Sequence, residues 1–419
     1  MKAPPISRPC SSACWGRRRA AIDSEVPAVV ARPRKGLARR ARAAMKLTRS
    51  LGGSAMWTRR SVAGALAATL GAPALARGAG RNRLFFDSLS FLPADLGQIA
   101  AAGLGGMIAD VSDLIATRDA DGVPRYSRNF AANDPAIDKA VERLRSTPFA
   151  YLARKGSEIG TRPGCAVFLQ FQSTEMIDRD LSRIAHFHEK GLRVLQFTHH
   201  NNTLFAGGAL ETQQTGLTPL GIEGLAEMNR LRIVPDVSHG SVATMIEAAT
   251  RSKTPIALSH GAARAIVDHP RCAPDEAIRA IAERGGVMGI FMMSFWLTRR
   301  NPPTVADYVA QIRHVVKVGG LEAVGIANDF PMAGQPNLIK LGNDNGKGVQ
   351  EYLDWWIALR RQGVPGFEWT PEHVVIPELN RIDRMARISQ ALDQAGFRPR
   401  EVDKIMGANW KRLLTDVLG

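Results

Sequence analysis

Short apolar runs alternate with stretches of helical periodicity from Leu84 onward. The runs have the length and the β-branched bias of buried strands. The expected strands are Leu84–Phe86, Gly106–Val111, Ala166–Phe171, Val194–Phe197, Ile233–Val237, Pro255–Leu258, Val287–Met292 and Ala323–Ala327. Eight strands separated by helices predict a parallel α/β fold, an eight-stranded (β/α) barrel of the TIM type over about Leu84–Lys340. An open doubly wound sheet is the competing prediction, but no Gly-x-Gly-x-x-Gly motif follows the first strand.

Helices are expected between the strands and after them. The main ones are Asp134–Lys155, Asp178–Lys190, Leu220–Leu231, Asp275–Arg284, Val305–Val318, Arg381–Ala395 and Arg400–Val417. The last two follow the barrel and are expected to pack on its outside. Residues 115–132 are polar and interrupted by glycine and proline, which predicts a loop.

The stretch Arg232–Arg264 contains the same arrangement twice, a short apolar strand followed by a Ser-His-Gly turn. The helix between the two strands is about the length that a parallel crossover needs. His239 and His260 are therefore expected at the carboxyl ends of neighbouring strands, where two imidazoles can form half of a metal site. The alternative is that both histidines hydrogen-bond the local backbone.

Polar side chains stand at other strand ends as well. They are Asp87, Gln172, His199 and Asp329. In a barrel these ends face one pocket, and converging histidines and carboxylates predict a metal hydrolase: the metal lowers the pKa of a bound water to about 7, and Asp329 can accept its proton. Asp329 could instead cap a helix or sit in a loop. His200 follows His199 directly, so at most one of the two is expected to point into the pocket.

Arg271 follows the sixth strand in the sequence Asp-His-Pro-Arg-Cys. A guanidinium can clamp a carboxylate with two hydrogen bonds, which makes Arg271 a candidate for substrate binding. A surface arginine that covers a helix start is the alternative.

The positive charge is concentrated near the N-terminus. Of the formal net charge of +16, residues 1–76 carry +13, from fifteen Lys and Arg against Asp23 and Glu25. The remaining chain is nearly neutral, so we expect no nucleic-acid partner. Paired arginines, an apolar run and the exit Ala74-Leu75-Ala76 are typical of a twin-arginine signal peptide, with an uncleaved anchor as the alternative. We therefore expect a leader over 1–76 and a single barrel domain over 77–419, exported to the periplasm or secreted, without a stable membrane span.

Cysteine usage gives little indication of function. Cys10 and Cys14 fall in the leader, and no Cys-x-x-Cys spacing occurs. Cysteine ligation of a metal is therefore not expected, and a disulfide between Cys165 and Cys272 stays open.

Several motifs in order resemble the membrane (renal) dipeptidase family, metal-dependent hydrolases with (β/α) barrels. They are GLTPLGIEGLAEMNRL, DVSHGS, LSHGAARAIVDHPRCAPDEAIRAIAERGGVMGI, VGIANDF and IMGANWKRLL. The resemblance implies a two-zinc site that cleaves dipeptides, often with a D-residue at the second position, and suggests a homodimer. By position it implies that His239 and His260 bind one zinc, that His199 and Arg271 contact the substrate, and that Asp329 is the acid/base.

Three positions depart from the family pattern. Asp87–Phe91 reads Asp-Ser-Leu-Ser-Phe where the family has Asp-Gly-His-Asn-Asp, so Leu89 and Phe91 replace two zinc ligands. Gln172 replaces a bridging glutamate, and Glu175 could substitute for it only along a different loop path. We therefore expect at most one zinc per chain, bound more weakly than in two-metal relatives.

Three functions stay open. The first is a dipeptidase-like hydrolase with one zinc on Gln172, His239 and His260. The second is a protein that binds a small peptide or carboxylate ligand without turnover. The third is metal-free acid/base chemistry by Asp329 and His199. Retention of both strand-end histidines favours the first function, and loss of the other ligands favours the second.

Replacing Arg59 and Arg60 with lysine should block export, because the twin-arginine route requires the paired arginines. The measurement is the amount of protein in the periplasmic fraction. N-terminal sequencing of the exported wild type should start near Arg77. Unimpaired export of the lysine variant would contradict this route, and an exported chain that retains Met56–Ala76 would contradict cleavage.

Overall fold

The computed structural model describes residues 83–118, 124–334 and 347–419. The predicted leader, signal peptide and cleavage position lie outside these residues. None of the helices within the described ranges is both long and apolar enough to cross a membrane.

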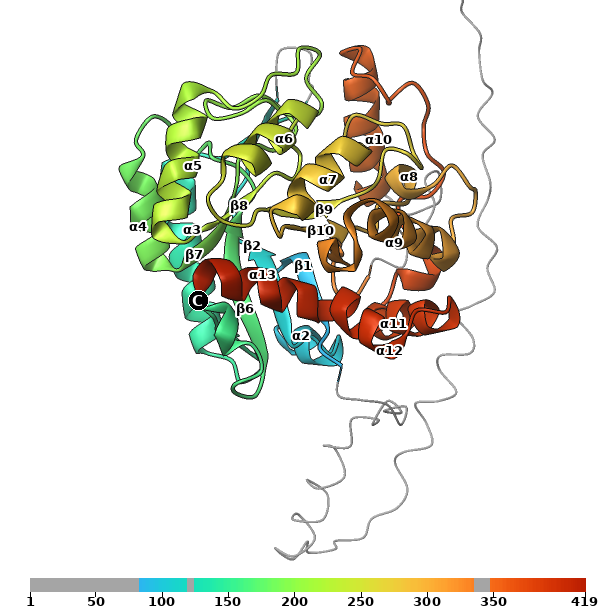
Figure 1. Ribbon diagram of the computed structural model, residues 1–419. Helices are drawn as coiled ribbons and strands as arrows, with labels where there is room; N and C mark the ends of the chain where they lie inside the picture. Colours follow the sequence, from blue (N-terminus) through green and yellow to red (C-terminus); the bar gives the residue numbers. More distant parts are fainter. Residues whose placement is uncertain (1–82, 119–123, 335–346) are drawn as a thin grey trace, which may run out of the picture. The chain divides into compact units, whose positions relative to one another are not determined.

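Eight parallel strands form an almost closed barrel with helices around it (Figure 1). Their order in the sheet is β1 (Phe86–Phe91), β2 (Gly106–Asp110), β6 (Cys165–Phe171), β7 (Leu192–Gln196), β8 (Val234–Asp236), β9 (Ala257–Gly261), β10 (Val287–Ile290) and β11 (Val324–Ile326). A short β5 (Ala150–Leu152) also pairs with β6. The predicted barrel class is confirmed.

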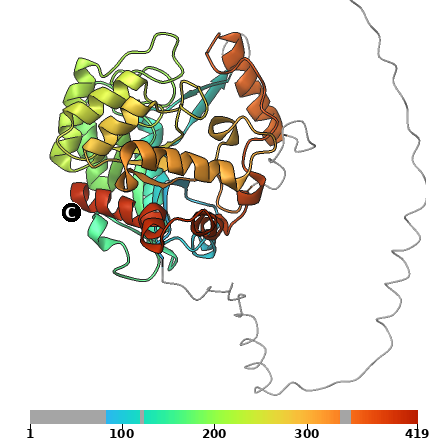
Figure 2. The ribbon, with the colours of Figure 1, turned by 45° about the vertical axis from the view of Figure 1, so that its right-hand side comes forward.

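The helices pack their apolar faces on the outside of the strands (Figure 2). Those before the last barrel strand are α2 (Gly97–Ala101), α3 (Phe130–Arg145), α4 (Ser182–Lys190), α5 (Pro219–Leu231), α6 (Val242–Arg251), α7 (Asp275–Glu283), α8 (Ser294–Leu297) and α9 (Val305–Gly319). Those after it are α10 (Lys347–Arg361), α11 (Arg384–Gln394), α12 (Pro399–Asp403) and α13 (Asn409–Leu418). Short turns complete the described chain: η1 (Gly156–Glu158), η2 (Leu321–Ala323), η3 (Pro377–Leu379) and η4 (Lys404–Ala408).

A second apolar cluster fills the amino-terminal end of the barrel. Trp410 of α13 is fully buried there and stacks on Phe86 of β1, with 6.1 Å between the ring centroids. Its indole lies so close to Gly325 of β11 that a Cβ at that position would meet it at 2.1 Å. Helix α13 therefore covers this end of the barrel.

Several predicted boundaries differ from the structure. The first strand begins later than expected, so the segment Asp87–Phe91 lies within β1 and not after it. Residues 115–132 were expected to be a loop but contain an antiparallel pair, β3 (Ile115–Arg118) and β4 (Pro124–Ser127). The helix expected to reach Lys155 ends at Arg145 and is followed by β5. Helix α10 was not predicted.

Side-chain hydrogen bonds close the gap between β1 and the end of β11. Asp87 is fully buried and accepts from the backbone and side-chain nitrogens of Asn328, at 2.9 and 2.6 Å. Ser88 Oγ donates to the carbonyls of Ser259 and Ile326, at 2.6 and 2.9 Å. The expectation that Asp87 faces the pocket is therefore wrong, because its carboxylate is used to close the barrel.

The two cysteines of the barrel are both buried and unpaired, so the disulfide left open from the sequence is absent. Burial raises the pKa of Cys165 well above its usual range and that of Cys272 to about 12. Both are therefore uncharged thiols in the apolar interior.

Asp87→Asn should flatten the pH dependence of stability. Burial raises the pKa of Asp87 from 3.8 to about 6, so between about pH 4 and 6 the folded protein binds a proton that the unfolded chain has lost. The free energy of unfolding then falls as pH rises through this window, by on the order of 3 kcal/mol. The introduced amide has a partner, since Asn328 Oδ1 lacks a hydrogen bond among the described residues. Thermal unfolding of both proteins between pH 4 and 7 measures the difference, and parallel curves would contradict it.

Candidate active site

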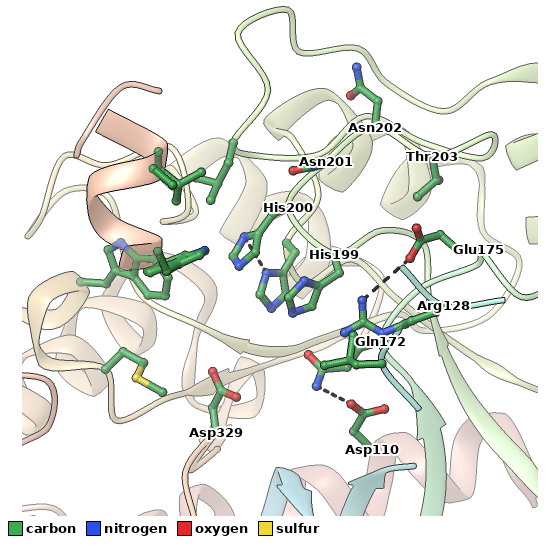
Figure 3. A pocket seen from close by; sticks show the side chains of 18 of the residues that line it. Asp110, Arg128, Gln172, Glu175, His199, His200, Asn201, Asn202, Thr203 and Asp329 are labelled. Atoms are coloured by element: carbon green, nitrogen blue, oxygen red, sulfur yellow. Dashed lines mark hydrogen bonds and ion pairs between the residues drawn. The ribbon is translucent and has the colours of Figure 1, made fainter. Parts of the chain in front are cut away.

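A cavity of about 440 Å³ opens at the carboxyl ends of the barrel strands (Figure 3). Its lining has three parts. The charged and amide side chains include Asp110, Arg128, Gln172, Glu175 and Asp329. The imidazoles are His199, His200 and His239. The apolar part includes Phe91, Leu210, Met293, Phe295, Trp296, Trp355 and Leu359. The volume is in the range of small-molecule sites.

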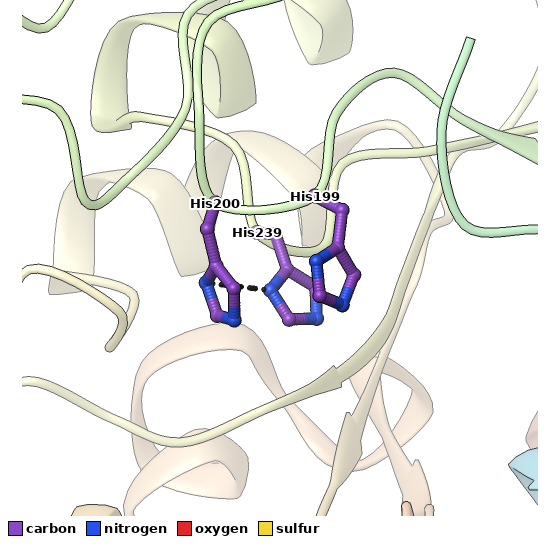
Figure 4. Close-up of side chains that lie close together, drawn as sticks. All are labelled: His199, His200 and His239. Carbon is purple, nitrogen blue, oxygen red and sulfur yellow. Dashed lines mark hydrogen bonds between the residues drawn. The ribbon is translucent and has the colours of Figure 1, made fainter. Parts of the chain in front are cut away.

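His199, His200 and His239 form a compact cluster that faces the cavity (Figure 4). Each offers one possible ligand nitrogen, and these atoms all lie within 4.8 Å of one another. His200 and His239 have left-handed backbone conformations, with φ of 71° and 62°. The turn at His200 lets two consecutive histidines face the same side. The expectation that at most one of them points into the pocket is therefore wrong.

His260 lies behind this cluster and is fully buried. Its Nε2 is 2.6 Å from Nε2 of His239, while Nδ1 of His239 is 3.0 Å from Nδ1 of His200. His239 thus contacts two imidazoles through its two different nitrogens. The two predicted ligands from neighbouring strands do converge, and their Nε2 atoms face each other.

A buried carboxylate fixes the tautomer of His260. Asp236 accepts hydrogen bonds from Gln170 Nε2 at 2.6 Å and from Ser259 Oγ at 2.5 Å. The hydroxyl of Ser259 donates its only proton to Asp236. Its oxygen therefore accepts a hydrogen bond from Nδ1–H of His260, 2.8 Å away. A neutral imidazole has one N–H, and Nε2 of His260 therefore presents a lone pair to His239.

The imidazoles of the site are neutral. Burial is the largest cause that lowers the pKa values of His199, His200, His239 and His260 well below 6.5. The positive charge of Arg271 lowers all four further. Neutral imidazole is the form that binds a transition metal, so the donor set suits one such ion.

Gln172 lines the cavity and is held by Asp110, whose carboxylate accepts from Gln172 Nε2 at 2.8 Å. The backbone N–H of Gln172 donates to Ser112 Oγ at 3.1 Å. Because the side-chain nitrogen Nε2 donates to Asp110, the side-chain oxygen Oε1 is the atom of Gln172 that is available to a cation.

Arg271 is not among the residues that line the cavity. It is 1% exposed, packs against Phe291 and Trp296, and donates from Nη2 to the carbonyl of His260 at 3.0 Å. Burial lowers its pKa to about 10. The alternative of a surface arginine is therefore wrong, and the structure places this cation beneath the site.

Many side chains of the lining were missed from the sequence, including three that are charged or aromatic. Arg128 follows the hairpin that was read as a loop, Asp110 ends β2, and Trp355 comes from the unpredicted α10.

Asp329 lines the cavity and has a left-handed backbone, with φ of 53°. Its N–H donates to the carbonyl of Leu89 at 2.9 Å, which orients it at the barrel closure. Burial raises its pKa to about 7, while the charge of Arg271 acts in the opposite direction. A carboxyl group that titrates near neutrality is suited to exchange protons with a reacting water.

The sequence model of the membrane dipeptidase family, peptidase family M19, matches residues 136–350, slightly more than half of the chain. The chain therefore belongs to this family. Dipeptidase tcpJ of Claviceps purpurea is 27% identical over 259 residues, which cover 60% of this chain and 51% of that protein. Dipeptidase verJ of Clonostachys rogersoniana is 30% identical over 222 residues, which cover 48% and 56%. The chain thus spans about half the length of these curated relatives.

Solved structures share the fold. An amidohydrolase from Pseudomonas aeruginosa superposes with a TM-score of 0.66 at 24% identity, covering 80% of this chain and 97% of that one. A metallo peptidase from Rhodobacter sphaeroides, liganded with a phosphinate mimic of the dipeptide L-Ala-D-Ala, gives 0.62 at 17% identity, covering 80% and 99%. At these identities the likeness supports the barrel fold.

The carboxyl group of Asp329 should titrate near pH 7 in protein treated with a chelator, because burial favours its neutral form. The measurement is the infrared difference spectrum of wild type minus Asp329→Asn. A protonated carboxyl band should grow as pH falls through about 7. A transition near pH 4 would contradict the burial argument.

Proposed function

We propose that this chain is a dipeptidase-like hydrolase that uses one zinc ion, held mainly by His239 and His260. The observation that carries the proposal is the convergence of their Nε2 atoms, 2.6 Å apart, with the lone pair of His260 directed at His239. A bound zinc would replace the proton that these two nitrogens share. When bound, the metal would supply Lewis-acid activation of water and of the peptide carbonyl.

The surrounding residues support this assignment. Ser259 and Asp236 orient His260, as the outer hydrogen-bond partners of metal-binding histidines commonly do. Nδ1 of His239 faces His200, which can serve the same purpose for that ring. Gln172 offers Oε1 as a weak third donor. Because these ligands are neutral, they do not reduce the charge of a bound cation. Two neighbouring cations would then repel each other at full strength, which favours a single ion.

A second zinc does not fit the remaining residues. Leu89 is fully buried in β1, and Phe91 presents hydrocarbon to the cavity. Glu175, the possible substitute ligand, lies 3.8 Å from Arg128 and is outside the histidine cluster. Without a bridging carboxylate, the repulsion between two adjacent dications is not offset by a charge held between them.

In this proposal the chain itself binds the substrate and moves a proton. Asp329, with its pKa near 7, accepts the proton of the attacking water and returns it to the leaving amine. The cavity volume suits a dipeptide, and tolerance of a D-residue at the second position is part of the proposal. Export to the periplasm and assembly as a homodimer stay predictions.

Ligand binding without turnover is the second candidate. It is favoured by Phe91, an apolar group at a position where the family has a ligand. Metal-free acid/base chemistry by Asp329 and His199 is the third. Both predict a cavity that binds a small ligand without any requirement for metal.

Two substitutions separate the candidates. His260→Ala should abolish both zinc binding and dipeptide hydrolysis, because it removes a ligand. Asp329→Asn should keep the zinc and lower turnover by about a hundredfold or more, the usual contribution of a general base. The measurements are elemental analysis of purified protein and a dipeptide panel that includes D-residues.

The wild type should contain at most one zinc per chain. Two tightly bound ions would show that other ligands replace Leu89 and Phe91. Absence of both metal and hydrolysis would favour the binding-only candidate.

A further inference from the structure

We infer that Arg128 is the carboxylate anchor of the cavity and that the ligand is a short molecule with a carboxylate at one end and an apolar side chain at the other. The inference rests on the proposed function, because it says that Arg128 binds the C-terminal carboxylate of the dipeptide substrate. It assigns to Arg128 a role that the family resemblance would give to Arg271.

Arg128 is a buried cation without adequate partners. It is only 4% exposed and lines the cavity. Among the described residues, its Nε has no hydrogen-bond partner, and its ion pair with Glu175 spans 3.8 Å, longer than a hydrogen bond. A guanidinium has five N–H donors, and leaving such a group unsatisfied in the interior is costly. A ligand carboxylate would satisfy it with two parallel hydrogen bonds.

The other arginine near the site is less suited to this role. Arg271 does not line the cavity, and Trp296 and Phe291 lie against its guanidinium, 5.7 and 5.2 Å from the ring centroids. Its Nη2 donates to the carbonyl of His260, while its Nε and Nη1 lack partners among the described residues, as Nε of Arg128 does. What distinguishes the two arginines is that only Arg128 lines the cavity. A ligand in the cavity therefore meets Arg128, which lines it, before Arg271, which does not.

The chemistry of the two ends of the ligand follows from which lining residues stand on either side of the histidine cluster. Arg128 and Glu175 lie on the His199 side of the histidine cluster (Figure 3). His200, at the other side, contacts Trp296 and Trp355, with centroid distances of 6.5 and 5.9 Å. A ligand that spans the cluster places its apolar side chain against the tryptophans and its carboxylate at Arg128. The bond between the two residues then lies at the histidines.

Glu175 competes with a ligand carboxylate for the guanidinium of Arg128, from which it is 3.8 Å away. Two carboxylates at the cavity, Asp110 and Glu175, act on the charge of Arg128. Asp110 accepts hydrogen bonds from Gln172 and Ser112, whereas the side chain of Glu175 is 36% exposed, so it can turn to solvent when a ligand carboxylate arrives. Removing its charge should therefore strengthen binding of an anionic ligand. If Glu175 instead bound the amino group of the ligand, the same change would weaken binding.

The test compares an uncleavable reduced-amide analogue of leucyl-alanine as free acid and as C-terminal amide. Both are titrated calorimetrically into the full protein. The wild type should prefer the acid by about tenfold or more, the range for hydrogen bonds to a charged group. Arg128→Gln should remove this preference and leave affinity for the amide within about twofold. Glu175→Gln should increase the preference.

Arg193→Gln is the matched control for losing a buried arginine. Arg193 is 6% exposed, donates to three backbone carbonyls and lies outside the cavity, so its replacement should leave the acid-to-amide ratio unchanged. If Arg128→Gln does not fold, Arg128→Lys takes its place and should reduce the ratio, because lysine lacks the planar fork.

The inference would be overturned if the Arg128→Gln variant kept the preference for the acid over the amide. It would also be overturned if the wild type showed no such preference. The readout is binding and not turnover. A protein that prefers the acid but cleaves no dipeptide would refute the proposed function and leave the role of Arg128 intact.

Discussion

The site depends on one buried carboxylate, Asp236 at the end of β8. It is fully buried and accepts hydrogen bonds from Gln170 of β6 and from the backbone and hydroxyl of Ser259 on β9. Burial raises its pKa, and the bonds from Ser259 and Ser238 act in the opposite direction. Because Asp236 takes the proton of Ser259, it determines which nitrogen of His260 is bare. A single carboxylate thus links the strands β6, β8 and β9 by hydrogen bonds. Through Ser259 it also fixes the tautomer of His260.

From this carboxylate a line of polar contacts runs outward through Ser259, His260 and His239 to His200 at the cavity. The rings along this line are neutral, so an arriving cation meets no repulsion from imidazolium charge. Leu89 is buried in the barrel, and Phe91 contributes an apolar side chain to the cavity lining. The cavity thus combines neutral imidazoles with an apolar wall.

The sequence predicted the parts of the fold that depend on hydrophobic periodicity. All eight barrel strands were found within a few residues, because each is a buried apolar run. The segment Asp87–Phe91 was placed after the first strand, although these residues continue β1 and their polar groups pair with Asn328 and Ile326. Helix α10 was missed, and its Trp355 contributes to the cavity.

The candidate site was predictable only where strand ends determine it. His239 and His260 follow from two repeated turns. The inward position of His200 depends on a left-handed φ that residue spacing does not indicate. The burial of Arg271 and the exposure of Arg128 to the cavity depend on how Trp296 and the β3–β4 hairpin pack, which is tertiary information.

The most direct test of the account is anomalous X-ray scattering at the zinc edge from crystals of the zinc-loaded protein. The account predicts one peak per chain, within coordination distance, about 2.0–2.1 Å, of Nε2 of both His239 and His260. Two peaks bridged by a carboxylate, or a single peak away from His260, would contradict it.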